Sequence, residues 1–170
     1  MKISKELAKE AKCKGICKSW LAELKGLEDK KQMVHMYLKG IDFCLSNDYP
    51  SNEYIRANFK GVMESLGVFL DDRIVLVNIA KCVSLGSTKG SIEITGFGCS
   101  EIFVKHTSEL TIIAKDDAFI MVDVFDDAII NIQAHDRAKV CVNRYMGATI
   151  VPYENDCSVI KIVEKIKKTY

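Results

Sequence analysis

Residues 118–147 read AFIMVDVFDD, AIINIQAHDR and AKVCVNRYMG, three segments of ten residues that each begin with alanine. In every segment apolar residues follow two and four positions after the alanine, as Ile120 and Val122 follow Ala118. Alternation at two residues is typical of a strand with one buried face. Repetition at a fixed interval is typical of a repeat fold. The stretch therefore predicts a series of short strands in constant register.

The interval continues on both sides of this stretch. Ala148 and Ser158 extend it, and Ser100 and Ser108 lead earlier, looser copies. Because Pro152 lacks a backbone N–H, we expect its strand to end early or to lie at a sheet edge. The expected core pairs are Ile92/Ile94, Ile102/Val104, Leu110/Ile112, Ile120/Val122, Ile130/Ile132, Val140/Val142 and Ile160/Ile162.

Two architectures fit the repeat. In a β-solenoid, two strand-and-turn units would form one coil of about twenty residues, and equivalent residues would stack between coils. In an antiparallel β-meander, the same units would be successive strands of one sheet. The small residue that leads each strand favours the solenoid, because the stacked inner corners of a coil are crowded. We therefore predict an α+β protein with a short β-solenoid and keep the meander as the alternative.

The chain before the repeat has helical spacing. Residues 1–70 are predicted to be a helical region, residues 73–164 the β-repeat region, and residues 165–170 a basic C-terminal tail. Helices are expected from the N-cap Ser4 to Gly15, over 20–27, over 33–45, and from the N-cap Ser51 to Leu66. We expect the helical region to cap one end of the repeat, because an open end exposes unpaired backbone groups.

Charge, cysteine content and the lack of long apolar runs indicate which classes of partner and which cellular location to expect. The chain has 170 residues with a formal net charge of +1, nearly balanced in both halves, which argues against a large nucleic-acid footprint. Seven cysteines are scattered along the chain, and this odd count favours reduced thiols over a disulfide framework. We find no apolar run that reads as a secretory signal or a membrane span. The expected location is the cytoplasm, without a membrane partner.

Aspartates recur between the predicted strands. Asp116, Asp126, Asp136 and Asp156 each precede the small residue by two positions. Short acidic side chains hydrogen-bond their own backbone in turns, and this explains the pattern without a ligand. A ladder of carboxylates could also attract calcium, but calcium-binding repeats need glycine-rich turns that are nearly missing here. We therefore assign no metal.

Other reactive side chains lack the spacing of a known site. Cys13 and Cys17 are one close pair of thiols, whereas structural zinc needs two pairs. Asp116 and Asp123 are the kind of residues that a carboxylate-based polysaccharide site on a solenoid would use, but nothing selects them. The three histidines, His35, His106 and His135, show no metal spacing. No phosphate loop, nucleophile elbow or dinucleotide fingerprint is present. We predict no enzyme and assign no catalytic, cofactor-binding or metal residues.

Three apolar residues lie on the strand face opposite the predicted core. Phe119, Met121 and Ile129 alternate with the core residues of their strands. If the helices pack on that face, these side chains form a second core layer. If the face is open, they form a patch that implies a partner or self-association. Both alternatives stand at this point.

Two partial resemblances add a setting. Gly15-Ile16-Cys17, Met36-Tyr37-Leu38, Asp42-Phe43-Cys44-Leu45 and Asp48-Tyr49-Pro50-Ser51 resemble small uncharacterised proteins of Bacteroidetes genomes, often in prophage-like regions. That resemblance implies a phage or mobile-element setting and carries no catalytic residues. The first forty residues are also similar to the helix–extended–helix pattern of SAP-type and Rho N-terminal nucleic-acid-binding modules, although Glu28-Asp29 precede Lys30-Lys31 where those modules are basic.

These observations favour a structural or protein-interaction protein. The β-repeat would present a stiff surface, and its outward strand faces would dock a protein partner or a second copy. The alternative is a nucleic-acid-associated adaptor that uses residues 1–40.

Overall fold

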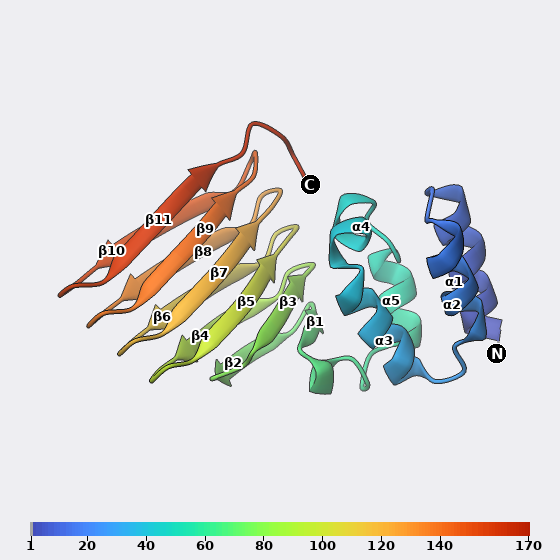
Figure 1. The fold of residues 1–170 in the computed structure, drawn as a ribbon, viewed down its shortest axis with the longest axis horizontal. Coiled ribbons are helices and arrows are strands. Elements are labelled where there is room, and N and C mark those ends of the chain that lie inside the picture. The colour runs from blue at the N-terminus through green and yellow to red at the C-terminus, as the bar shows by residue number, and fades with distance from the viewer. Residues whose placement is uncertain (1) are drawn as a thin grey trace. The chain divides into compact units, whose positions relative to one another are not determined.

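The computed structural model describes residues 2–170, which form two compact units (Figure 1). The first unit is helical and comprises residues 2–66 with Tyr170, and the second comprises residues 67–169. The helical unit contains α1 (Lys2–Cys13), α2 (Lys18–Gly26), α3 (Lys30–Lys39), α4 (Ile41–Ser46), α5 (Asn52–Asn58) and the 3-10 helix η1 (Glu64–Leu66).

Helix α1 has the buried face that its sequence predicts. Leu7, Ala8 and Ala11 recur at helical spacing and are all buried. Gly15 follows the helix with a φ of 86°, a left-handed conformation that suits glycine at a helix C-terminus. The predicted N-cap is wrong, because the helix already begins at Lys2 and Ser4 lies buried inside it.

The predicted helix over 33–45 is divided into α3 and α4 at Gly40. Residue 40 must be glycine because Trp20 packs closely against it: a Cβ at this position would lie 2.6 Å from the indole ring atom Cζ3. The predicted N-cap of the last helix is confirmed, because the Ser51 hydroxyl accepts a hydrogen bond from the Tyr54 N–H. That helix ends at Asn58, and only η1 continues towards Leu66.

The second unit is a β-solenoid, as the ten-residue interval predicts. Its strands are all parallel within two sheets, so the antiparallel meander is excluded. Odd-numbered strands form a six-stranded sheet in the order β1-β3-β5-β7-β9-β11, and even-numbered strands form a five-stranded sheet in the order β10-β8-β6-β4-β2. The strands are β1 (Val68–Leu70), β2 (Arg73–Val77), β3 (Lys81–Leu85), β4 (Lys89–Ile94), β5 (Cys99–Val104), β6 (Glu109–Ala114), β7 (Phe119–Val124), β8 (Ile129–Ala134), β9 (Lys139–Arg144), β10 (Thr149–Glu154) and β11 (Val159–Glu164).

Each coil of the solenoid contains two ten-residue units, one for each sheet. Ile120 therefore pairs with Val140, twenty residues later in the same sheet. The second and fourth residues of the strands point inward and stack between coils, and Ile130 and Ile132 are fully buried there. Burying one such side chain stabilises the fold by roughly 1.5–3 kcal/mol. The alanines that lead the strands are buried as well, which confirms that they occupy crowded corners.

The ends of the repeat differ from the sequence-based boundaries. Residues 68–70, which the pattern places in the helical region, form β1 of the six-stranded sheet. The strand with Pro152 runs its full length as β10 and lies at the edge of the five-stranded sheet, which confirms the edge alternative. The predicted basic tail is hydrogen-bonded to the solenoid. The Lys165 N–H donates to the Arg144 carbonyl, and the Lys167 carbonyl accepts from the Met146 N–H.

Candidate functional site

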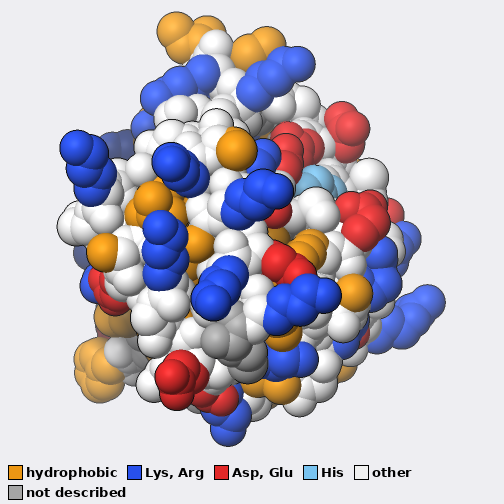
Figure 2. Space-filling model, turned by 90° about the vertical axis from the view of Figure 1, so that its right-hand side faces the viewer, with side chains coloured by type: hydrophobic (Ala, Val, Ile, Leu, Met, Phe, Trp, Pro, Cys, Tyr) orange, Lys and Arg blue, Asp and Glu red, His pale blue; other side chains and the backbone are white. Residues whose placement is uncertain are grey.

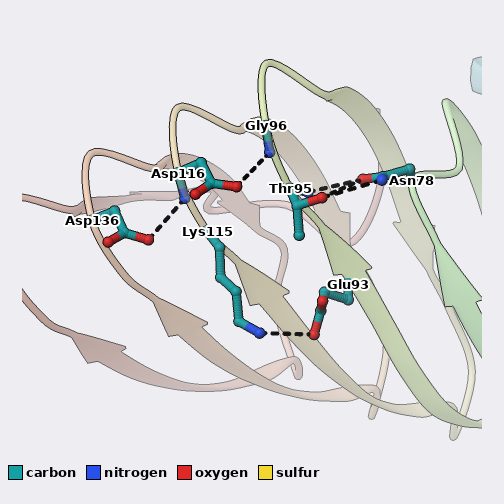
Figure 3. A network of polar contacts seen from close by, with 7 residues as sticks. All are labelled: Asn78, Glu93, Thr95, Gly96, Lys115, Asp116 and Asp136. Carbon is teal, nitrogen blue, oxygen red and sulfur yellow. Dashed lines mark hydrogen bonds and ion pairs between the residues drawn. The ribbon is translucent and has the colours of Figure 1, made fainter.

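The turns along one side of the solenoid are joined by a ladder of aspartate side chains (Figure 3). The Asp116 carboxylate accepts a hydrogen bond of 2.7 Å from the Gly96 N–H, one coil earlier in the chain. Asp136 accepts from the Asp116 N–H at 3.0 Å, and Asp156 accepts from the Asp136 N–H at 3.1 Å. Asp116, Asp136 and Asp156 all have a positive φ, of 56° or 57°. They therefore adopt the left-handed conformation in their turns.

The opposite side has a shorter ladder of the same kind. The Gly86 N–H donates to Nδ1 of His106 at 3.0 Å, and the His106 N–H donates to the Asp126 carboxylate at 3.2 Å. Asp126 also receives the ammonium group of Lys105 at 3.0 Å, and Lys105 is almost fully buried. His106 therefore replaces an aspartate as a hydrogen-bond acceptor, and its role in this ladder is structural.

These contacts correct the explanation of the turn aspartates. Each carboxylate bonds the backbone of the preceding coil rather than its own turn, and the spacing of twenty residues between Asp116, Asp136 and Asp156 is the signal that could have revealed this. One carboxylate oxygen in each rung is already used by a backbone donor. Within residues 2–170 no group of acidic, histidine or cysteine side chains is arranged to hold a metal ion.

An ion pair extends across the same turns. Arg137 donates two hydrogen bonds of 2.7 Å to the two carboxylate oxygens of Asp117, one coil earlier. The bidentate geometry orients both side chains. Hydrogen bonding by the guanidinium, together with its charge, lowers the pKa of Asp117 below its ordinary value.

The remaining reactive residues are not brought together. Asp116 lies in the turn before β7 and Asp123 is the fifth residue of that strand, so the strand rise from Phe119 to Asp123 alone is roughly 13 Å. Paired carboxylates for glycoside hydrolysis are about 5–9.5 Å apart. Asp123 accepts a hydrogen bond of 2.6 Å from the Asn143 amide. His35 is exposed on α3, and His135 lies 6.2 Å from the Tyr153 ring. Cys13 and Cys17 are both exposed free thiols.

The outer face of the six-stranded sheet carries a compact apolar group. The first, third and fifth residues of each strand point outward. In β7 these include Phe119 and Met121, which are both 43% exposed. Their neighbours on the adjacent strands, fixed by the parallel register, are Cys99 and Glu101 on one side and Lys139 and Cys141 on the other.

Charged residues border that group in a defined order. Lys81 and Glu101 form an ion pair of 2.9 Å at the β3–β5 side. Lys139 lies beside Phe119 in β9, and Lys161 follows two strands after Met121 in β11. We call this surface the outer β5–β11 face; it comprises Cys99, Glu101, Phe103, Phe119, Met121, Asp123, Lys139, Cys141, Asn143, Val159, Lys161 and Val163.

The outer face of the five-stranded sheet is polar at its centre and apolar on its two edge strands, where Val75 and Val77 of β2 and Val151 and Tyr153 of β10 are all more than half exposed. Its third-position column runs Ser91, Thr111, Asn131 over three successive strands. Lys89 and Glu109 form an ion pair of 2.9 Å there. Ile129 belongs to this face and is 37% exposed, so the three apolar residues singled out in the sequence lie on two different faces.

At the C-terminal edge of the solenoid, some positions that could donate a hydrogen bond to another strand are missing or already occupied. The N–H groups of Thr149 and Asn155 donate to the preceding coil at 2.9 Å. Because alternate amides of a strand point to opposite neighbours, the amide of residue 152 faces the open edge, where proline has no hydrogen to offer. On β11 the edge-facing N–H of Ile160 donates to the Glu154 carboxylate. Both features oppose the addition of another strand at this edge.

The helical unit carries an exposed row of lysines. Lys5, Lys9 and Lys12 recur at steps of four and three on α1, opposite its buried face, and all are exposed. Residues 1–39 contain ten lysines and five acidic residues. Figure 2, which views the molecule from the side on which α1 and α2 lie in Figure 1, shows basic side chains spread over much of that surface. The connection between α1 and α3 contains α2, whereas the SAP-like pattern expects an extended segment.

Within the described residues, no helix has the length and apolar character that crossing a membrane requires. Comparison of the chain with protein-family models, with curated proteins and with solved structures finds no match.

Proposed function

We propose that this protein is a non-enzymatic structural or interaction protein that assembles by docking its outer β5–β11 face on a protein surface. The observation that supports this is the exposure of Phe119 and Met121, at 43% each, next to one another on a strand held from both sides. Two large apolar side chains on a rigid, preformed surface lose little conformational entropy when a partner covers them. Apolar side chains of this kind are enriched in the centres of interfaces.

Two further observations agree with assembly through a face. The C-terminal edge is blunted by Pro152 and by the contact from Glu154 to Ile160, so growth by strand addition is opposed. The separation of Asp116 from Asp123 and the use of His106 in a turn ladder leave these residues in structural contacts. The resemblance of residues 14–75 to prophage-associated proteins would place such an assembly protein in a phage or mobile-element setting, inside a cell.

The proposal is tested by measuring self-association, because a second copy of the chain is a partner whose identity is known. Sedimentation velocity over a wide range of protein concentration should show association of the wild-type protein. Met121→Glu should abolish it, because the glutamate would be dehydrated in the interface. The matched control is Asn131→Glu, at the equivalent exposed third position of β8 in the other sheet, which should associate like the wild type.

Stability separates a lost interface from a lost fold. Both variants change exposed residues and should stay folded, so Asn131→Glu should unfold like the wild type, whereas Met121→Glu should melt slightly lower because its carboxylate lies beside Glu101 on β5. A wild-type protein that stays monomeric at every concentration would refute self-assembly. If Met121→Glu associates as strongly as the wild type, association does not occur through the outer β5–β11 face.

A second candidate function is nucleic-acid binding, favoured by the lysine row Lys5, Lys9 and Lys12 on α1. A basic row along a helix is the electrostatic footprint of phosphate binding. An electrophoretic shift with duplex DNA at low salt should weaken steeply as salt rises, because phosphate contacts release counterions. Lys5→Glu/Lys9→Glu should remove the shift, and no shift for the wild type at low salt would reject this function.

A further inference from the structure

The segment that follows β11, dark red in Figure 1, is held against the last coil of the solenoid. The Lys165 N–H donates to the Arg144 carbonyl at 2.8 Å, and the Met146 N–H donates to the Lys167 carbonyl at 3.2 Å. These two backbone hydrogen bonds lie on either side of Ile166. The side chains of residues 165–168 therefore extend from a backbone that is tied down and not from a frayed end.

This segment carries positive charge that the chain does not neutralise. The acidic residue of the stretch 159–168 is Glu164, and Arg144 holds it in an ion pair of 3.2 Å. Earlier in the solenoid the lysines are paired with carboxylates, namely Lys81, Lys89, Lys105 and Lys115. In contrast, four lysines of the last strand and the segment after it form no ion pair within residues 2–170: Lys161, Lys165, Lys167 and Lys168.

The carboxylates on the neighbouring turn do not cancel this charge. Asp126 is already paired with Lys105 at 3.0 Å. Asp127 follows it and offsets at most one of the four positive charges. The end of the solenoid at which the chain leaves β11 is therefore basic, and charge complementarity requires an anionic partner there.

Two exposed apolar side chains lie among these lysines. Ile166 is 98% exposed, the highest value among the large apolar side chains that the structure describes, and Met146 is 52% exposed. Ile166 lies between Lys165 and Lys167 in the chain, and the backbone of Met146 is bonded to that of Lys167. Basic side chains around a projecting apolar side chain are the combination with which proteins bind the surface of a membrane.

The projection of Ile166 distinguishes between anionic partners. The phosphates of a nucleic acid would match the lysines but would offer Ile166 no apolar contact. An acidic protein would need a pocket shaped for this one side chain. The surface of a bilayer supplies both contacts, because anionic headgroups attract the lysines and the acyl boundary takes up an apolar side chain without a preformed pocket. The expectation of no membrane partner rested on the lack of a spanning segment, and a surface contact needs none.

We propose that residues 165–168 are an interfacial anchor that docks the solenoid on an anionic lipid surface, with the lysines on the headgroups and Ile166 in the interface. Each lysine near such a surface strengthens binding about fivefold, and one apolar side chain adds a similar factor. The binding is therefore reversible and weakens as salt rises. This anchor goes beyond the docking of the outer β5–β11 face and does not depend on it.

Cosedimentation with lipid vesicles tests the anchor. The wild type should bind vesicles of phosphatidylcholine with about 30% phosphatidylserine at low salt and should bind pure phosphatidylcholine vesicles at least tenfold more weakly, on the order of the effect of the lysines. Lys167→Gln/Lys168→Gln should lower the partition coefficient about 25-fold, and Ile166→Ser should lower it about fivefold. These residues are exposed, so the melting temperatures of both variants should match that of the wild type.

The matched control is Lys5→Gln/Lys9→Gln, which removes the same charge from the exposed row on α1. It should bind the vesicles like the wild type. A wild type that does not bind the anionic vesicles, or a control that loses as much binding as Lys167→Gln/Lys168→Gln, would overturn the anchor.

Two further measurements keep the partner and the two proposals apart. If Ile166→Ser binds vesicles as tightly as the wild type, and duplex DNA binds in dependence on Lys167 and Lys168, the lysines serve a rigid polyanion and the lipid surface is overturned. Met121→Glu should bind vesicles like the wild type, because Met121 lies on β7 outside the anchor. Loss of self-association in that variant therefore leaves the anchor unaffected.

Discussion

Asp136 offers a direct measurement of what the turn ladder contributes to stability. Its carboxylate accepts the Asp116 N–H at 3.0 Å, and its own N–H donates to Asp156 at 3.1 Å. Asp136→Ala removes one hydrogen bond to a charged acceptor, which costs about 1 kcal/mol at this exposed site. It also places alanine at a φ of 57°, which costs about 1 kcal/mol more. We therefore expect a loss of about 2 kcal/mol in the free energy of unfolding.

Two companion variants separate the contributions. Asp136→Asn keeps an oxygen acceptor and tolerates the left-handed conformation, so it should lie close to the wild type. Asp136→Gly keeps the conformation but loses the acceptor, so it should lie between the asparagine and alanine variants. Differential scanning calorimetry should show a melting temperature about 10 °C lower for Asp136→Ala, as expected for a unit of about 100 residues.

The order of the three variants is the critical result. Equal melting temperatures for Asp136→Ala and Asp136→Gly would refute the backbone contribution. An asparagine variant as unstable as the alanine variant would refute the idea that the side-chain oxygen is an acceptor for the preceding coil.

Three further predictions concern the core, the ion pairs and the thiols. Ile130→Asp should unfold the repeat because it buries a carboxylate in the core, whereas Lys139→Asp on the exposed face should be tolerated. Equal melting temperatures of the two variants would contradict the assignment of Ile130 to the inner face and Lys139 to the outer face of the strands. Hydrogen bonding from Arg137 lowers the pKa of Asp117, so this ion pair stabilises the fold at neutral pH, and its contribution is lost as pH falls through that lowered pKa. A carboxyl titration followed by NMR should show a higher pKa of Asp117 in Arg137→Gln than in the wild type. Burial raises the pKa of Cys82 to about 12, so a thiol reagent at pH 8 should label Cys82 only after unfolding, while the exposed thiols react in the native protein.

The sequence by itself determined the repeat, because a solenoid is specified locally. Each ten-residue unit carries its own small corner residue and inward pair, and the next coil repeats the same constraint, so Ile120 and Ile130 could be assigned to the core without knowledge of their partners. The Ser51 cap is likewise local, since its acceptor and donor are three residues apart.

Only the tertiary structure decided the features that depend on residues far apart in the chain. The need for glycine at residue 40 comes from the Trp20 ring, and the ladder contact of Asp136 requires a turn twenty residues earlier. The composition of the outer β5–β11 face also depends on residues far apart in the chain. Phe119 and Lys139 become neighbours only when the chain has completed a whole coil, so the arrangement of charges around Phe119 arises from the stacking of coils and not from the local pattern.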